Sequence, residues 1–419
     1  METRKTVEDF YAFKAKNMWA YFKRQHFAFW MICAYLFFEF VRPQALFPAI
    51  SVVPWAQLSL LGAVAGIFSD QSVKKVSSTA NIYVVLFTLT IIISVMTATY
   101  PEIAKKYILD FISWVIVYFL IVNIVNTKER FYIFLMIYIF AAGKIALGTS
   151  KSWVFRGFSF TSWGLMGPKG YFQNSGELAI LMLMLFPLAF YLYQALKNKI
   201  SKWERLLLAV FWICPILTIL GASSRGAQVA LILQLLIMFR KSVFRFKSLL
   251  GILVLIGGIN FLLPAEQKER FSSAGDDKTS QQRLLYWENG WEMMKNYPVT
   301  GVGFFNFASY FEAYYPEDML YRRAQLPHNI FIQVGTDAGF IALFIFILLI
   351  LYCLWHPLKI ARSPSVDAVD KNISVGLGYG VLGFLIAGQF VTVAYYPFLW
   401  VHLAFIVSMT RIVKTYAKY

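Results

Sequence analysis

The stretch NIFIQVGTDAGFIALFIFILLILYCLW, residues 329–355, decides the fold, because it is long, strongly apolar and carries a single charged side chain, Asp337. A helix needs about 20 apolar residues to cross the hydrocarbon core of a bilayer. As a helix, this stretch would extend about 40 Å, so it can cross the core and project beyond it. It therefore predicts a membrane-spanning helix.

Apolar runs recur along the rest of the chain. Of its 419 residues, 59% are apolar and 15% are charged, whereas about 25% are charged in an average soluble protein. We predict an all-α polytopic integral membrane protein with one membrane domain, residues 1–419, which excludes a secreted disulfide scaffold, a cytosolic enzyme and a DNA-binding protein. The twelve candidate spans are residues 27–41, 50–68, 80–99, 107–126, 130–148, 176–196, 205–222, 223–240, 247–264, 329–355, 373–394 and 397–413.

The lysines and arginines predict the orientation of these spans. With the N-terminus inside, the inner segments hold 24 of the 39 basic residues and the short outer links hold seven. Because short cytoplasmic loops carry the excess of positive charge, we expect both termini in the cytoplasm. Residues 265–328 would form one large, partly helical loop on the outer face, between spans nine and ten. The net charge of +17 is then mainly an orientation signal, with membrane lipids rather than nucleic acid as the partner.

Arg225 begins an unusually short apolar segment. The 14 residues between Arg225 and Arg240 would cover about 21 Å of a core about 30 Å thick. Arg225 should therefore lie near the outer hydrocarbon boundary, in the turn Ser223-Ser224-Arg225-Gly226. An arginine at this depth either faces a wet cavity and binds an anion, or extends to lipid headgroups. The sequence leaves both interpretations open.

The large loop is expected to contain an amphipathic helix over residues 281–295. Thr279 or Ser280 would cap its N-terminus, and Pro298 follows its end. The apolar face would carry Leu284, Trp287, Trp291 and Met294.

Arg283 would fall in the first turn of this helix. The helix dipole is positive at that end, so dipole and guanidinium together would make a phosphate site. The alternative is a solvated arginine paired with Glu269 or Glu288.

The loop ends with Leu326-Pro327-His328-Asn329, directly before the tenth span. His328 would stand at the outer rim of the membrane, where a neutral imidazole can act as a general base. A lone histidine is often purely structural, and that alternative also stays open.

Other common sites are absent from the sequence. There is no P-loop, GxSxG or HExxH motif. Cys33, Cys214 and Cys353 all fall in apolar runs, which argues against a disulfide framework or a zinc site. Asp276-Asp277 is a weak candidate for a metal ligand in a flexible turn, so we predict no metal and no cofactor. Glu39, Asp110 and Lys144 lie within spans and are candidates for a buried pair or relay.

Taken together, these motifs resemble the bacterial O-antigen ligase and polymerase family. The resemblance covers roughly residues 165–345, and the N-terminal segment Phe38–Gln44 is similar to a subgroup of O-antigen ligases. The residues that carry it are Gly170–Asn174, Ser224-Arg225-Gly226, Arg283, Trp287, Pro298, Gly301, Gly303, His328-Asn329, Gly335 and Gly339.

The resemblance implies a bacterial inner-membrane protein whose large loop, residues 265–328, is periplasmic. It also implies metal-independent, inverting glycosyl transfer at the periplasmic face. The donor would be a glycan on undecaprenyl diphosphate, and the acceptor a sugar hydroxyl of lipid A-core for a ligase or of another glycan for a polymerase. Arg225 and Arg283 would stabilise the diphosphate, and His328 would take the acceptor proton. Further candidate ligands of the diphosphate or the sugars are Lys169, Asn174, Trp287, Arg322 and Asn329.

A lipid-linked glycan transporter or flippase is the rival class. Such proteins usually show repeated halves and broken helices near the midplane. The sequence shows no repeat, and its candidate residues gather at one face. Composition and topology do not separate a ligase from a polymerase, because both need the same donor chemistry.

Overall fold

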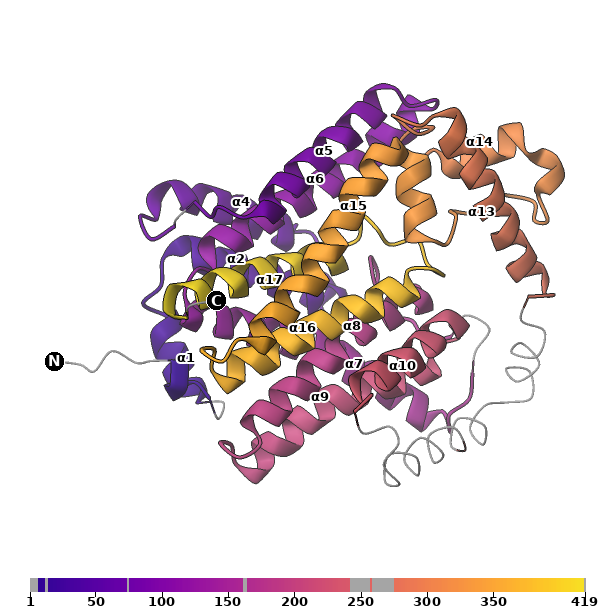
Figure 1. Ribbon diagram of the computed structural model, residues 1–419. Coiled ribbons are helices and arrows are strands. Elements are labelled where there is room, and N and C mark those ends of the chain that lie inside the picture. The colour runs from indigo at the N-terminus through magenta and orange to yellow at the C-terminus, as the bar shows by residue number, and fades with distance from the viewer. Residues whose placement is uncertain are drawn as a thin grey trace.

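The protein was analysed as a computed structural model that describes residues 7–11, 14–73, 75–160, 164–241, 257 and 275–417. All regular structure among these residues is helical (Figure 1). Three short 3-10 helices cover Val7–Asp9, Pro48–Ile50 and Pro316–Asp318. The α-helices are α1 (Ala15–Phe22), α2 (Phe27–Phe40), α3 (Pro43–Leu46), α4 (Trp55–Ser69), α5 (Thr79–Met96), α6 (Pro101–Ile124), α7 (Lys128–Phe155), α8 (Ser175–Leu196), α9 (Lys202–Gly221), α10 (Arg225–Met238), α13 (Lys278–Asn296), α14 (Phe307–Tyr314), α15 (Ile330–Arg362), α16 (Ala368–Ala387) and α17 (Pro397–Tyr416).

Seven of the described helices are long and apolar enough to cross a membrane: α5, α6, α7, α8, α9, α15 and α17. Helices α2, α4 and α10 are apolar but shorter. Eleven of the twelve predicted spans coincide with a described helix, whereas the span predicted over residues 247–264 lies, apart from residue 257, outside the described residues. For the described residues the all-helical fold with several candidate membrane spans is therefore confirmed, while the total of twelve spans and the periplasmic side of the loop stay predictions.

The helices form one bundle, with α13 and α14 at its edge (Figure 1). Helix α8 packs between α9 and α16, and α15 packs against α5 and α16. Helix α13 contacts the bundle mainly through α15. The described part of the large loop, residues 275–328, therefore rests on the first turns of α15.

Helix α15 is broken at Gly339, where φ is +79°. The break lets the Phe340 N–H reach Pro298 O at 2.8 Å, and the Val302 N–H reach Thr336 O at 2.8 Å. Gly301 has φ +65°, and a Cβ at this position would lie 2.3 Å from Thr336 O. Only glycine fits such a left-handed, closely approached backbone. This junction fixes the end of α13 on α15.

The structure corrects three details of α13. The helix begins at Lys278, so Arg283 lies in its second turn rather than its first. Its N-cap is Asp277, not Thr279 or Ser280. The buried face carries Gln282, Tyr286, Asn289, Gly290, Met293 and Met294. Of the predicted face only Met294 is buried, because the helix turns a partly polar side toward α14 and α15, leaving Leu284 and Trp291 about half exposed.

The ionisable residues predicted within spans do not form a common relay. Glu39 Oε1 accepts a hydrogen bond from Arg42 Nη2 at 2.9 Å, three residues along the chain. Lys144 Nζ donates to Val41 O at 3.3 Å, and Asp110 is exposed. Arg42 also donates to Lys169 O. This contact ties the end of α2 to the loop that leads into α8.

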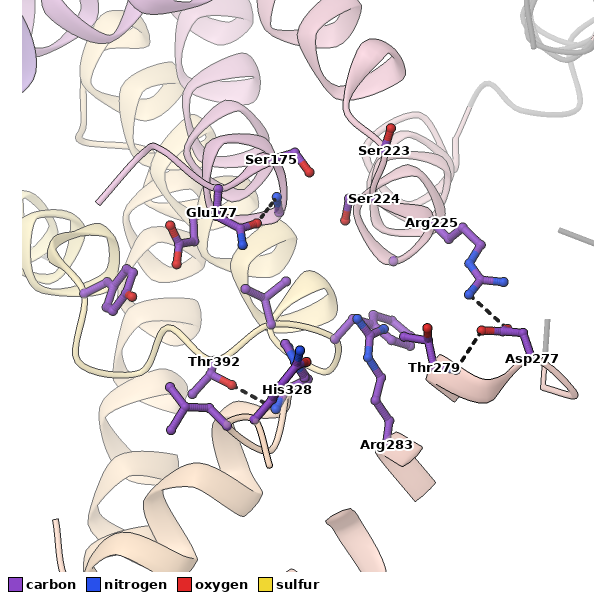
Figure 2. A pocket seen from close by; sticks show the side chains of 18 of the residues that line it. Ser175, Glu177, Ser223, Ser224, Arg225, Asp277, Thr279, Arg283, His328 and Thr392 are labelled. Atoms are coloured by element: carbon purple, nitrogen blue, oxygen red, sulfur yellow. Dashed lines mark hydrogen bonds and ion pairs between the residues drawn. The ribbon is translucent and has the colours of Figure 1, made fainter. Parts of the chain in front are cut away.

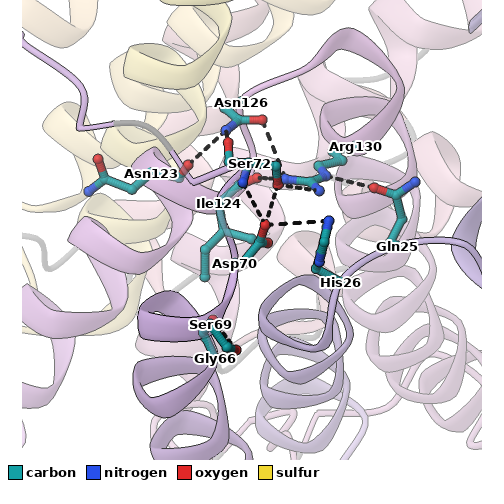
Figure 3. A network of polar contacts seen from close by, with 10 residues as sticks. All are labelled: Gln25, His26, Gly66, Ser69, Asp70, Ser72, Asn123, Ile124, Asn126 and Arg130. Carbon is teal, nitrogen blue, oxygen red and sulfur yellow. Dashed lines mark hydrogen bonds and ion pairs between the residues drawn. The ribbon is translucent and has the colours of Figure 1, made fainter.

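A polar network joins α6, α7, the α1–α2 connection and the α4–α5 connection around Arg130, which is 4% exposed (Figure 3). Arg130 donates from Nε to Gln25 Oε1 at 2.8 Å and from Nη2 to Ser72 Oγ at 2.9 Å. Ser72 in turn donates to Asp70 Oδ1 at 2.6 Å. A buried guanidinium needs such acceptors, because an unpaired buried charge is strongly destabilising.

Replacing Arg130 by methionine is expected to destabilise the protein by about 3 kcal/mol, because the buried oxygens of this network lose their donor. The measurement is thermal unfolding in detergent, with Lys23→Met as a control, since Lys23 is exposed. An unfolding midpoint for Arg130→Met equal to that of the control would show that the network contributes nothing to stability.

Candidate functional site

Three helix N-termini meet at one cavity of about 720 Å³ (Figure 2). They belong to α8, α10 and α13, whose N-caps are Asn174, Ser224 and Asp277. Backbone N–H groups at a helix N-terminus favour anions. The connections before α15 and between α16 and α17 close the cavity. Its lining comprises Asn174, Ser175, Gly176, Glu177, Ser223, Ser224, Arg225, Gly226, Asp277, Lys278, Thr279, Arg283, Gln325, Leu326, His328, Phe390, Val391, Thr392 and Tyr396.

Arg225 occupies the first position of α10 and lines this cavity. Its Nη2 donates to Asp277 Oδ2 at 3.0 Å, and both side chains are about one quarter exposed. Burial raises the pKa of Asp277, but hydrogen bonds from Ser280 and Arg225 outweigh burial and hold this pKa below its usual value. The carboxylate is therefore ionised at neutral pH. Of the two interpretations of Arg225, the geometry favours the cavity over lipid headgroups.

Arg283 reaches the same cavity from the second turn of α13. Its Nε is buried with no hydrogen-bond partner, and the predicted pairing with Glu288 is not formed. Glu269, the other predicted partner, lies outside the described residues. Burial and then the charge of Arg225 lower the pKa of Arg283. Two guanidinium groups thus share one cavity, which favours a multivalent anion between them.

His328 lies at the cavity wall in the left-handed backbone region, with φ +53°. This conformation is costly for a residue other than glycine. Two contacts impose it: the His328 N–H donates to Thr392 Oγ1 at 2.8 Å, and Trp287 Nε1 donates to the preceding carbonyl, Pro327 O, at 2.9 Å. These two hydrogen bonds therefore hold the backbone that carries the imidazole in a fixed conformation.

The imidazole of His328 is neutral over a wide pH range. Burial, and then the positive charge of Arg283, lower its pKa to about 4. Its Nε2 lies 3.0 Å from Gln325 Oε1, which is an acceptor, so Nε2 carries the proton. Nδ1 is then the nitrogen that can accept a proton.

Of three other predicted ligands, one lines the cavity and two do not. Asn174 lines the cavity, and its Oδ1 accepts the Gly176 N–H at 2.9 Å as the cap of α8. Lys169 is exposed, does not line the cavity and contributes its carbonyl to Arg42. Arg322 is exposed in the connection before α15 and does not line the cavity either.

Asn329 and Trp287 act on the cavity through the backbone. Asn329 caps α15, with Oδ1 accepting from the Phe331 N–H at 2.8 Å. Its Nδ2 donates to Gln389 Oε1 at 3.2 Å, which connects it to the α16–α17 connection. Both residues hold the segment that carries His328, and neither side chain lines the cavity. A direct contact of either with substrate stays a prediction.

Sequence reasoning missed several lining residues. Asp277, which the sequence suggests only as a weak metal ligand in a flexible turn, caps α13 and pairs with Arg225. Glu177, in the first turn of α8, and Tyr396, before α17, lie in the wall of the cavity as well. Aspartate is a preferred N-cap residue, so the sequence does contain a signal for the role of Asp277 as the cap of α13. Nothing in the sequence links Tyr396 to residues 174–177.

The described residues contain no group of three or more His, Cys, Asp or Glu side chains arranged to hold a metal ion. Among the charged groups of the cavity wall, Arg225, Lys278 and Arg283 face two carboxylates, Glu177 and Asp277. This arrangement suits the binding of an anion by arginines and helix N-termini. Metal-independent chemistry stays a prediction.

Residues 208–347, about a third of the chain, match the family model described as O-antigen ligase. The match includes Arg225, Arg283 and His328, the three residues that the sequence motifs placed in the site. This part of the chain is therefore similar to the O-antigen ligase family, in agreement with the resemblance, and the match supports an O-antigen ligase-like family. No curated protein matches the chain.

Proposed function

We propose that this O-antigen ligase-like chain is a glycosyltransferase that moves a glycan from undecaprenyl diphosphate to a sugar hydroxyl of lipid A-core or a similar acceptor. The observation that carries the proposal is the convergence of Arg225, Arg283 and His328 on one cavity surrounded by three helix N-termini. At about 720 Å³ the cavity has the size of a small-molecule site, large enough for a diphosphate and its first sugar.

The charge of the leaving group gives a reason for the two arginines in the cavity. As the acceptor oxygen attacks the anomeric carbon, the bond between that carbon and the diphosphate oxygen breaks, and its electrons go to the phosphate. Arg225, Arg283 and the N–H groups at the helix N-termini stabilise this developing charge. Because the attack comes from the side opposite the leaving group, the configuration at the anomeric carbon inverts.

The acceptor hydroxyl loses a proton in the same step. His328 Nδ1 is the proposed proton acceptor, since Nε2 is engaged with Gln325 and the imidazole is neutral. In Figure 2, Glu177 lies to the upper left of His328, whereas Arg225 and Asp277 lie to its right. The cationic side would hold the donor diphosphate, and the side of Glu177 and Thr392 would hold the acceptor sugar.

Two other functions lead to different outcomes. A polymerase of the same family would use a second lipid-linked glycan as acceptor. A transporter would bind substrate near the midplane between repeated halves, whereas this cavity lies at helix ends.

The test is deletion of the gene in its native host, followed by gel analysis of lipopolysaccharide. A ligase predicts that all long chains disappear from lipid A-core while undecaprenyl-linked polymer persists. Accumulation of single repeat units on lipid A-core would identify a polymerase. Unchanged glycan composition with retention at the inner face would instead support a transporter.

The site must also face the periplasm for this function. We expect a cysteine at Glu317, which is exposed, to react with a membrane-impermeant maleimide in intact spheroplasts. A cysteine at Asn198, exposed in the α8–α9 connection, should react only after permeabilisation. The three native cysteines are buried and give little background. The reverse pattern would put the cavity in the cytoplasm and refute the proposed reaction.

A further inference from the structure

Asp277 brings a negative charge into the part of the cavity where the proposed function requires a diphosphate. Its Oδ2 accepts a hydrogen bond from Arg225 Nη2 at 3.0 Å (Figure 2). A carboxylate and a phosphate are both acceptors for guanidinium groups. Donor and Asp277 would therefore compete for Arg225, or repel each other if both stayed beside it.

Asp277 has a second set of partners that does not depend on Arg225. Its Oδ1 accepts the N–H groups of Thr279 and Ser280, both at 3.2 Å. Its Oδ2 accepts Ser280 Oγ at 2.7 Å. If Arg225 turned away, the carboxylate would still be hydrogen-bonded as the cap of α13. Separating Arg225 from Asp277 would therefore not leave the carboxylate unpaired. An unpaired buried charge is the main cost of breaking such an ion pair.

Arg225 and Arg283 differ in the hydrogen-bond partners of their guanidinium groups. Arg225 has a carboxylate on Nη2, whereas Arg283 Nε is buried without a partner. A diphosphate can fill the vacancy at Arg283 directly. At Arg225 it has to replace an anion that is already bound.

We propose that Asp277 is a resident counter-ion of Arg225, which the donor diphosphate displaces on binding and which recaptures Arg225 as undecaprenyl diphosphate leaves. This inference rests on the proposed function. Asp277 touches no reacting atom and acts through Arg225, so it is a positioning residue. Its effect is to weaken the binding of donor and product alike, and weaker product binding favours turnover.

The test uses Asp277→Asn, which keeps the size and the capping ability of the side chain but removes its charge. The purified full-length protein is assayed for inhibition by undecaprenyl diphosphate and for the KM of the lipid-linked donor. We expect both constants to fall about two- to fivefold, the range for one partly exposed ion pair. Asp277→Ser should give the same result, since serine also caps helices.

Asp276→Asn is the matched control. It removes the same charge one residue earlier, from an exposed side chain that does not line the cavity. A general electrostatic effect would lower the inhibition constant and the donor KM in both variants. Displacement of Asp277 from Arg225 predicts that these constants fall in Asp277→Asn alone.

Two results would overturn the inference. Unchanged or weaker inhibition in Asp277→Asn and Asp277→Ser, with normal transfer by the wild type, would show that Asp277 only tethers α13 to α10. If the wild type neither transfers glycan nor binds undecaprenyl diphosphate, the proposed function itself fails, and this inference with it. Thermal unfolding of Asp277→Asn and Asp277→Ser would reveal a folding defect in either variant. If Asp277→Asn does not fold, the inhibition assay is carried out with Asp277→Ser.

Discussion

Alanine at Arg225 or Arg283 is expected to lower glycan transfer about 10³-fold while leaving folded protein in the membrane. In the proposed reaction each guanidinium would donate several hydrogen bonds to the charge that develops on the leaving diphosphate, and removing one such donor commonly costs about 10²–10³-fold in rate. The loss should be at the upper end here, because a removed arginine also takes a full positive charge from the cavity. Transfer is measured with purified protein and a lipid-linked donor.

Lysine should restore little activity at either position. A lysine ammonium is a point charge and lacks the planar fork that binds two oxygens at once. Arg323→Ala is the control, because Arg323 is exposed in the same loop and does not line the cavity. Transfer by Arg225→Lys and Arg283→Lys at the wild-type rate would mean that only diffuse positive charge matters.

Replacing His328 by glutamine is expected to reduce turnover about 10²–10⁴-fold, the usual contribution of a general base. Glutamine cannot take the acceptor proton, but it keeps a polar side chain of similar length. The donor should still bind, because the arginines are unchanged. Loss of donor binding, measured directly with undecaprenyl diphosphate, would instead make His328 a diphosphate ligand.

The pH dependence gives a second test of His328. Its pKa of about 4 means that the imidazole is neutral above pH 4, so the proposed base would be lost as pH falls through that value. The acid limb of kcat/KM for the donor should accordingly lie near pH 4. A bound diphosphate offsets the charge of Arg283, which is the second cause of the low pKa, so the acid limb of kcat should lie at higher pH. Coincident acid limbs near pH 6.5 would show a solvated histidine.

The sequence by itself determined the class of protein and most of the helices. Apolar runs such as residues 340–355 leave no choice but a buried or lipid-exposed helix, because every backbone polar group must be bonded within the chain. Runs of this kind are local, so eleven predicted spans coincide with a described helix. The motifs around Arg225, Arg283 and His328 also resemble an O-antigen ligase-like family, which the match over residues 208–347 supports.

Only the tertiary structure decided which faces meet. The aromatic face predicted for α13 is wrong because burial depends on what packs against a helix, and α14 and α15 contact the side of Tyr286 and Met293. Asp277 became a partner of Arg225 for the same reason, since 52 residues separate them in the chain. Local sequence fixes each helix terminus and its charges, but the convergence of three termini on one cavity arises from long-range packing, which no local pattern encodes.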